Sequence, residues 1–494
     1  MMHLLFSCLV IVPATLVVDA LARPRSKTLL RRGAGSLLLV LITFLVFGIL
    51  LALSGNPFLA AILVLALHLL FVVASNAKND MLGEPLLFSD LALISAVFQH
   101  PQFYFSALSR VQKMLGIIAF AALTVAFVWL FEVNWLLRLS GLAIGLIAWA
   151  LLRICLRMGA FRTLGVTPDA RADVSLLGLI STLLLYWTNW RADAGRVAHP
   201  VAGHHASLFD GGPKRNQHAD PEIIVAIQCE SFADPLEIFG DQGVELPNLE
   251  GARRQAVLWG NLLVSGFGAY TMRTEYGVLF GQEEEALGFR RYDPYLTAMQ
   301  DGVLALPRRL GIDRWRSVFI HPHDMRFYSR HRILPEAGFA ELIDDRAFDR
   351  PSAMEGRYVR DAAVADKILE VARATTVPTF LYAVTIENHG PWSSSGGEAL
   401  VAHYNRLVQA GDAMLGQLRD GIAALRRPAI LAFFGDHRPS IPGASEPGGD
   451  RHTPFVILRF DADGQIVPGD NRREDITPAS LHHALLALGR QAEE

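Results

Sequence analysis

The segment AILAFFGDHRP, residues 429–439, joins an apolar run to an acidic and a basic side chain. Its first six residues carry no alternating polar positions, which is typical of a strand buried on both faces of a sheet. Asp436 and His437 follow that strand at once. A carboxylate oxygen and an imidazole nitrogen suit a borderline divalent ion such as Zn²⁺ or Mn²⁺. For this pair alone, an aspartate that caps a turn or helix is an equally good interpretation.

The same pattern of short apolar runs recurs through the C-terminal half of the chain. We expect strands in residues 222–231, 317–322, 379–390 and 454–458, in addition to the one above. Amphipathic stretches at residues 358–375 and 401–425 predict helices between them. Continuous apolar strands that alternate with helices favour an α/β domain, with a sheet covered by helices on each side.

Several of these strands end in side chains that commonly bind metals or phosphates. Sites in α/β sheets form beyond the carboxyl ends of the strands, so these side chains are expected to gather there. A structural salt bridge is the alternative for a buried carboxylate, and single histidines are more often structural than catalytic. The candidates besides Asp436 and His437 are Glu230, His321 with His323, and His389.

A glycine-bearing loop, SGFGAYTMRTEYGVLFG at residues 265–281, leads into a predicted helix. Thr271 falls near the start of that helix, where backbone N–H groups and the helix dipole favour an anionic oxygen. A threonine hydroxyl becomes a useful nucleophile only when a base or a metal activates it. The alternatives are that Thr271 is merely an N-cap residue, or that Thr274 is the reactive threonine.

A basic segment, IHPHDMRFYSRHR at residues 320–332, adds arginines to the predicted histidine cluster. Arg330 and Arg332 offer planar forks that match phosphate oxygens. A solvated basic loop is the alternative interpretation. His452, just before the last predicted strand, is a weaker candidate for the same pocket.

The first 190 residues have the composition of a membrane protein. Apolar runs long enough to cross a hydrocarbon core of roughly 30 Å occur near residues 2–20, 35–54, 57–75, 114–132 and 136–156, with a shorter sixth candidate near 174–190. We therefore predict a transmembrane domain of five or six helices at residues 1–190, a linker at 191–219 and a catalytic domain at 220–494.

Charge and cysteine content indicate on which side of the membrane the C-terminal domain lies and which partners are excluded. Basic loops follow the first and fifth predicted spans, and the positive-inside rule then places the C-terminal domain on the non-cytoplasmic side with five or six spans. The formal net charge of −3 gives no basic footprint for nucleic acid. The three cysteines, at positions 8, 155 and 229, form no disulfide framework.

Four motifs in this order resemble the lipoteichoic acid synthase group. They are ESF at residues 230–232, Thr271 with Glu275 four residues later, NHGP at 388–391 and FGDH at 434–437. That group contains membrane phosphoglycerol transferases of the alkaline phosphatase/sulfatase superfamily. The resemblance implies an α/β domain with a central mixed sheet flanked by helices, carried by a polytopic α-helical membrane domain.

The resemblance also implies roles for individual residues. One divalent ion, manganese in lipoteichoic acid synthases and zinc in related phosphoethanolamine transferases, would be bound by Glu230, Thr271, Asp436 and His437. Thr271 would be the nucleophile, because it precedes Glu275 with the spacing of the family. The substrate-binding set would be His389, Arg330, Tyr328 and His321, with Tyr328 at a position where the family commonly has tryptophan.

The expected reaction is metal-dependent transfer of phosphoglycerol from phosphatidylglycerol through a phosphothreonine intermediate. The sequence departs from the Gram-positive pattern, since MRTE follows the nucleophile position where SDAE is usual, and its Ala/Arg/Leu-rich composition is typical of proteobacteria. We therefore expect a periplasmic or cell-surface glycan acceptor, and a multi-pass protein of the bacterial inner membrane with a periplasmic catalytic domain.

Three other functions are alternatives to phosphoglycerol transfer. A phosphoethanolamine transferase would use a different head group, although such enzymes often carry disulfides and Cys229 is the only cysteine in the soluble half. A phosphodiesterase or sulfatase would release its product to water, but residues 270–275 lack the C/S-x-P-x-R context of sulfatases. A transporter or scaffold without activity would have no need of a full set of metal ligands.

Overall fold

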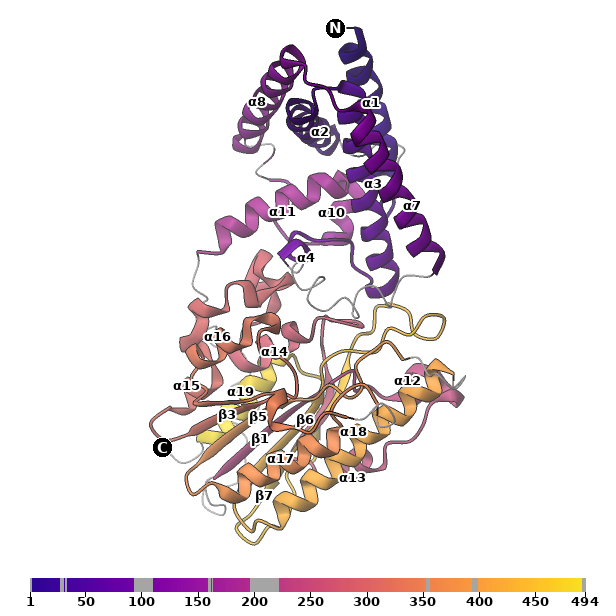
Figure 1. Cartoon of the computed structure of the whole chain (residues 1–494). Helices are drawn as coiled ribbons and strands as arrows, with labels where there is room; N and C mark the ends of the chain where they lie inside the picture. The colour runs from indigo at the N-terminus through magenta and orange to yellow at the C-terminus, as the bar shows by residue number, and fades with distance from the viewer. Residues whose placement is uncertain are drawn as a thin grey trace. The chain divides into compact units, whose positions relative to one another are not determined.

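The computed structural model describes residues 2–26, 31, 33–92, 110–158, 161, 163–195, 222–351, 356–392 and 399–490 (Figure 1). The chain divides into two compact units, Met1–Gly195 and Arg196–Glu494, and each is described by itself. Most of the predicted linker at 191–219 lies outside the described residues.

The N-terminal unit is helical. Within its described residues, five helices are long and apolar enough to cross a membrane, which confirms the predicted helical membrane domain. Each falls on one of the five predicted spans, and the third continues well past its predicted end at residue 75. These helices are α1 (Met2–Ala20), α2 (Gly33–Ser54), α3 (Pro57–Leu82), α7 (Arg110–Leu130) and α8 (Trp135–Arg157).

The predicted sixth span does not form one helix. Residues 174–190 are divided between α10 (Ala170–Leu177) and α11 (Leu179–Asp193), because Gly178 between them has a φ of 90°. α11 has 15 residues, fewer than the roughly 20 that a spanning helix needs. A short helix, α4 (Phe88–Ala92), follows α3.

Glycines let two of the long helices approach closely. A Cβ on Gly48 of α2 would lie 2.4 Å from the backbone nitrogen of Gly145 on α8, and a Cβ on Gly141 would lie 2.5 Å from the nitrogen of Ala52. Small residues at such contacts give membrane helices the backbone packing that replaces the hydrophobic effect in lipid.

The C-terminal unit contains an eight-stranded sheet in the order β4-β3-β5-β1-β6-β7-β2-β8. Among these described strands, β7 is antiparallel to both of its neighbours and all other pairs are parallel, so the sheet is mixed as predicted. The strands are β1 (Ile223–Cys229), β2 (Leu258–Leu262), β3 (Arg316–Ile320), β4 (Glu341–Ile343), β5 (Thr379–Val384), β6 (Ala429–Gly435), β7 (Thr453–Phe460) and β8 (Arg472–Arg473).

Helices cover both faces of this sheet (Figure 1). On one face α13 (Pro247–Gln255), α17 (Asp361–Ala374) and α18 (Leu400–Ala423) pack against Val225 and Ile227 of β1. On the other, α14 (Thr271–Phe280) and α15 (Leu306–Leu310) pack against α19 (Pro478–Arg490), whose Gly489 approaches Ile224. Successive residues of β1 therefore face opposite layers, which explains the continuous apolar strands.

Shorter helices lie in the connections between these elements. The α-helical ones are α12 (Pro235–Phe239) and α16 (Arg330–Glu336), and the 3₁₀ segments are Gly240–Gln242, Glu284–Tyr292, Pro294–Leu296, Ala298–Leu304, Phe327–Ser329 and Asp345–Ala347.

The stability of this unit should depend on pH because it contains a buried histidine, His482. His482 of α19 is fully buried, with Nδ1 2.9 Å from the carbonyl of Val278 and Nε2 3.0 Å from Arg309 Nη1. Burial first, and then the charge of Arg309, lower its pKa well below 6.5. The unfolded chain therefore binds more protons than the folded one, and stability should fall as pH drops below about 6.5.

We expect the thermal midpoint of the wild-type protein to be lower at pH 5.5 than at pH 7.5, with a smaller decrease for His482→Gln. Equal falls in both proteins would contradict this assignment.

Candidate active site

The parallel strands bring the predicted side chains to one edge of the sheet. β1 pairs with β5 on one side and with β6 on the other, and Cys229 lies opposite Gly435. The next residues, Glu230 and Asp436, therefore leave neighbouring strands at the same level. The backbone N–H of Glu230 donates to the hydroxyl of Thr385, the residue after β5, at 3.0 Å. Residues more than 200 positions apart thus meet at one point because of the strand order.

Glu230, Asp436 and His437 form a buried cluster with the geometry of a metal site. One ligand atom from each lies within 4.8 Å of the others. Nε2 of His437 is 3.5 Å from Oε1 of Glu230 and 3.5 Å from Oδ2 of Asp436. At most 4% of any of these residues is exposed. Three potential ligands therefore converge where water has little access.

Hydrogen bonds orient two of these ligands toward the shared point. Oδ1 of Asp436 accepts from the backbone N–H groups of Ser231 at 2.8 Å and His437 at 2.9 Å. Its Oδ2 is buried and has no hydrogen-bond partner among the described residues. Nδ1 of His437 lies 3.2 Å from the carbonyl of Arg438, so the ring proton belongs on Nδ1 and the lone pair on Nε2.

The electrostatics of the cluster fit a bound cation. Burial, and then the neighbouring Asp436 carboxylate, raise the pKa of Glu230 to about 8. A buried carboxylate oxygen without a donor, such as Oδ2 of Asp436, needs a compensating positive group. Two carboxylates and an imidazole are a donor set that Zn²⁺ and Mn²⁺ accept. The residues present therefore fit a divalent ion.

Thr271 begins α14, and hydrogen bonds attach this helix start to the segments that carry Glu230 and Asp436. Nε2 of Gln228 donates to the carbonyl of Thr271 at 3.3 Å, which links the helix to β1. The N–H of Gly268 donates to the carbonyl of Arg438 at 2.8 Å, which links the loop before the helix to the loop that follows β6. Tyr270, just before the helix, has a φ of 78°. This left-handed residue makes the sharp turn from the loop into the helix.

The two candidate threonines have different environments. The hydroxyl of Thr274 is buried and donates to the backbone carbonyl of Asp436 at 2.7 Å. Within the described part of the chain, the hydroxyl of Thr271 has no hydrogen-bond partner. Thr274 therefore attaches α14 to the loop of Asp436, and Thr271 is the better candidate for a reacting group.

Arg330 is held by a buried carboxylate next to the site. Its Nε and Nη2 donate to the two oxygens of Glu275 at 2.9 and 2.6 Å, and the hydroxyl of Tyr295 donates to the same carboxylate at 2.6 Å. Arg330 is 1% exposed. Burial, and then the charge of Arg330, lower the pKa of His321. The pair with Glu275 leaves Nη1 of Arg330 for another acceptor.

Two histidines at neighbouring strand ends share the same orientation. Nδ1 of His321, after β3, lies 2.9 Å from the carbonyl of Val384, and Nδ1 of His389 lies 2.8 Å from the carbonyl of Gly390. Burial lowers the pKa of both rings, most strongly for His321. Both are therefore neutral near pH 7, and His321 keeps Nε2 as a proton acceptor. The ring of His323 lies 5.8 Å from that of His321.

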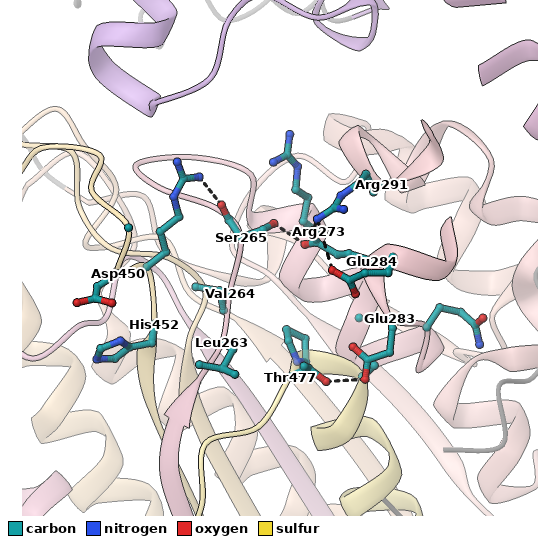
Figure 2. A pocket seen from close by; sticks show the side chains of 17 residues that line it. Leu263, Val264, Ser265, Arg273, Glu283, Glu284, Arg291, Asp450, His452 and Thr477 are labelled. Atoms are coloured by element: carbon teal, nitrogen blue, oxygen red, sulfur yellow. Dashed lines mark hydrogen bonds and ion pairs between the residues drawn. The ribbon is translucent and has the colours of Figure 1, made fainter. Parts of the chain in front are cut away.

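The last two predicted substrate residues lie in different surroundings. Tyr328 has a φ of 54°, and its ring lies 5.2 Å from the guanidinium carbon of Arg330. His452 contacts Glu237 and Arg438, each at 2.8 Å from its Nε2. It also lines a separate pocket, and none of Glu230, Thr271, Asp436 and His437 lines that pocket (Figure 2).

Sequence reasoning missed Tyr358. Its ring lies 5.7 Å from the ring of His389, and its hydroxyl is buried with no hydrogen-bond partner in the described structure. Burial, with a smaller effect from Glu230, raises its pKa to about 12. The sequence placed Tyr358 at the start of an amphipathic helix, but α17 begins only at Asp361. The amphipathic pattern includes Tyr358 in the helix, so no signal in the sequence indicated its position beside His389.

Comparison with known proteins identifies the family of the C-terminal unit. The sequence model of the family described as Sulfatase matches residues 222–488, which span the sheet and every strand end discussed above. The chain belongs to the sulfatase family. This sulfatase domain confirms the predicted membership of the alkaline phosphatase/sulfatase superfamily.

Individual relatives extend the likeness to the membrane helices. The chain is 29% identical over 465 residues to the capsular polysaccharide biosynthesis protein RkpI of Rhizobium meliloti, covering 90% of this chain and 85% of that protein. The structure of the integral membrane protein lipooligosaccharide phosphoethanolamine transferase A from Neisseria meningitidis matches with a TM-score of 0.53 and 13% identity. The match covers 98% of this chain and 94% of that protein, and it shows a likeness of fold. The lipoteichoic acid synthase LtaP of Listeria monocytogenes has a TM-score of 0.43 and 19% identity, with 61% and 78% covered.

Proposed function

We propose that this sulfatase-family protein transfers the phosphoglycerol head group of phosphatidylglycerol to a glycan acceptor. The observation that carries the proposal is the buried cluster of Glu230, Asp436 and His437. The helix that begins at Thr271 is attached to this cluster by the hydrogen bond from Thr274 to the carbonyl of Asp436. These three residues and Thr271 would hold one divalent ion, with Mn²⁺ as the first choice and Zn²⁺ as the alternative. When bound, the ion supplies Lewis-acid chemistry, which lowers the pKa of a neighbouring hydroxyl and neutralises phosphoryl oxygens.

In the first half of the reaction, Oγ1 of Thr271 attacks the phosphorus of the lipid head group. A new P–O bond forms to threonine, and the P–O bond to diacylglycerol breaks. Nε2 of His321 takes the threonine proton and returns it to the departing diacylglycerol oxygen. A ring that is neutral near pH 7 suits this role, since it can accept a proton at that pH. Arg330, His389 and Tyr328 would hold the phosphate and glycerol.

In the second half, a hydroxyl of the acceptor attacks the same phosphorus. The P–O bond to Thr271 breaks, and the proton of the acceptor hydroxyl is transferred to Oγ1 of Thr271. The product is a phosphoglycerol diester of the acceptor, and the free threonine is restored. Water in place of the acceptor would give hydrolysis, so exclusion of water during this step decides between a transferase and a phosphodiesterase.

The membrane helices support a lipid donor. A phospholipid stays in its bilayer, and a domain anchored by several spanning helices remains close to it. The positive-inside pattern supports a periplasmic position for the catalytic domain, in the inner membrane of a bacterium. The acceptor would then be a periplasmic or cell-surface glycan. The name of the relative RkpI, a capsular polysaccharide biosynthesis protein, supports a polysaccharide.

The experiment that tests the proposal compares two lipid donors. The purified full-length protein is incubated with phosphatidylglycerol or phosphatidylethanolamine, each labelled in its head group, with and without Mn²⁺. We expect Mn²⁺-dependent release of diacylglycerol and labelling of the protein from phosphatidylglycerol only. Labelling from phosphatidylethanolamine instead would identify a phosphoethanolamine transferase. Free glycerol phosphate as the sole product, with a glycan present, would identify a hydrolase.

A further inference from the structure

A separate cavity of about 290 Å³ lies beside α14 (Figure 2). Its walls come from residues 263–265 after β2, from Arg273 and Gly277 on α14, from residues 282–285 and 449–452, and from the start of α19. Arg273 and Gly277 are four residues apart and share one face of the helix. Thr271 precedes Arg273 by two residues, about 200° around the helix. The cavity therefore lies on the other side of α14 from the nucleophile.

The charges around this cavity are almost balanced. Three arginines face four carboxylates in its lining, which leaves a formal charge of −1 with His452 neutral. Figure 2 shows Glu284 between Ser265 and Arg291, and it accepts from Arg291 Nη2 at 2.8 Å. Glu283 already accepts from the hydroxyl of Thr477 at the start of α19. An anionic ligand would compete with these carboxylates, so the lining favours a neutral polar ligand.

Two rigid planar groups in the wall offer hydrogen bonds: the amide of Gln282 can donate and accept, and the guanidinium of Arg273 can only donate. Gln282 is 4% exposed; its Nε2 donates to the carbonyl of Gly281 at 3.3 Å, and its Oε1 has no partner within the described residues. The guanidinium carbon of Arg273 lies 3.8 Å from the centre of the Tyr270 ring, and 5% of Arg273 is exposed. Buried, positioned amide and guanidinium groups match the paired donors and acceptors of sugar hydroxyls.

The remaining lining is apolar and small. Leu263, Val264, Pro478 and Ala479 contribute to it, and the volume is at the low end of the roughly 300–1,000 Å³ typical of ligand sites. A sugar ring presents hydroxyl groups at its edge and C–H groups on its face. Such a ligand would satisfy the polar rim and cover the apolar residues, whereas a phospholipid chain would place hydrocarbon against charged groups.

We propose that this cavity binds a neutral sugar unit of the glycan acceptor. The inference rests on the proposed function, because it assigns a subsite to the second half of that reaction. Ser265 in the cavity wall belongs to the loop between β2 and α14, and Arg273 lies in the first turn of α14, which begins at Thr271. A sugar unit bound here would lie on the face of α14 away from Thr271 and the metal ligands, so another unit of the same glycan would carry the attacking hydroxyl.

Direct binding to an inactive protein tests the subsite. The full-length Thr271→Ala protein in detergent is titrated calorimetrically with a neutral glucan oligosaccharide and with a uronic acid oligosaccharide of the same length. We expect the neutral sugar to bind more tightly. Adding Gln282→Met or Arg291→Met should weaken its binding by about tenfold, the effect of one lost hydrogen bond to a charged or buried group. Arg346→Met, at an exposed ion pair with Asp344, is the matched control and should leave binding unchanged.

The proposal is overturned if neither oligosaccharide binds, if the acidic one binds more tightly, or if both cavity variants bind as well as the control. Thermal midpoints of all proteins identify any variant that fails to fold. Failure of the proposed function has a different signature, since the wild-type protein would then acquire no head-group label at Thr271 while glycan binding persisted.

Discussion

Replacement of Thr271 by alanine should abolish head-group transfer while the protein still binds its metal ion. The nucleophile would be lost, and catalysis should fall by about a thousandfold or more, as for nucleophiles in other covalent mechanisms. Glu230, Asp436 and His437 remain, so stoichiometric Mn²⁺ should still copurify. Diacylglycerol release from phosphatidylglycerol measures the first effect, and elemental analysis of the protein measures the second.

Two further variants make this result specific to one oxygen atom. Thr271→Ser keeps a hydroxyl and should retain measurable transfer, with the label on serine. Thr274→Val removes the bond to the carbonyl of Asp436 but should still yield a protein labelled at Thr271. Wild-type turnover by Thr271→Ala, or a label found on Thr274, would exclude Thr271 as the nucleophile.

The convergence of Glu230, Asp436 and His437 could be anticipated from the sequence because Glu230 and Asp436 each directly follow an apolar strand. Parallel strands end at one edge of a sheet, so Glu230 after β1 and Asp436 after β6 had to lie near each other once the two strands paired. The long apolar helices could be predicted equally well, because a run of about 20 consecutive apolar residues is typical of a membrane-spanning helix. In both cases the signal lies within one short stretch of sequence.

Other features depend on contacts that no local pattern contains. Glu275 and Arg330 are 55 positions apart, and their buried pair exists only because α14 and α16 pack near each other. The edge strands β4 and β8 have three and two residues, and β8 is Arg472–Arg473, which has no apolar pattern. His452 was predicted to join the catalytic pocket, yet Glu237 and Arg438 hold it beside another one.

The second large effect should come from replacing Asp436 by asparagine. The amide oxygen of the introduced side chain can still accept the two backbone hydrogen bonds that Oδ1 receives from Ser231 and His437. The charge on Oδ2, which has no hydrogen-bond partner among the described residues, would be lost. The fold should therefore persist while the affinity for the ion falls steeply, since a neutral amide replaces an anionic ligand. Transfer should fall by about a hundredfold or more.

Thermal unfolding with and without Mn²⁺ separates metal binding from folding. An ion at 100 times its Kd stabilises the folded state by about 2.7 kcal/mol, so Mn²⁺ should raise the midpoint of the wild-type protein. It should raise that of Asp436→Asn little or not at all. Asp412→Asn is the matched control, because Asp412 is also buried and accepts from the backbone N–H groups of Asn248 and Leu249, away from the cluster. That variant should be less stable but keep the response to Mn²⁺. An undiminished response in Asp436→Asn would show that the ion binds elsewhere, and the proposed role of the cluster would fail with it.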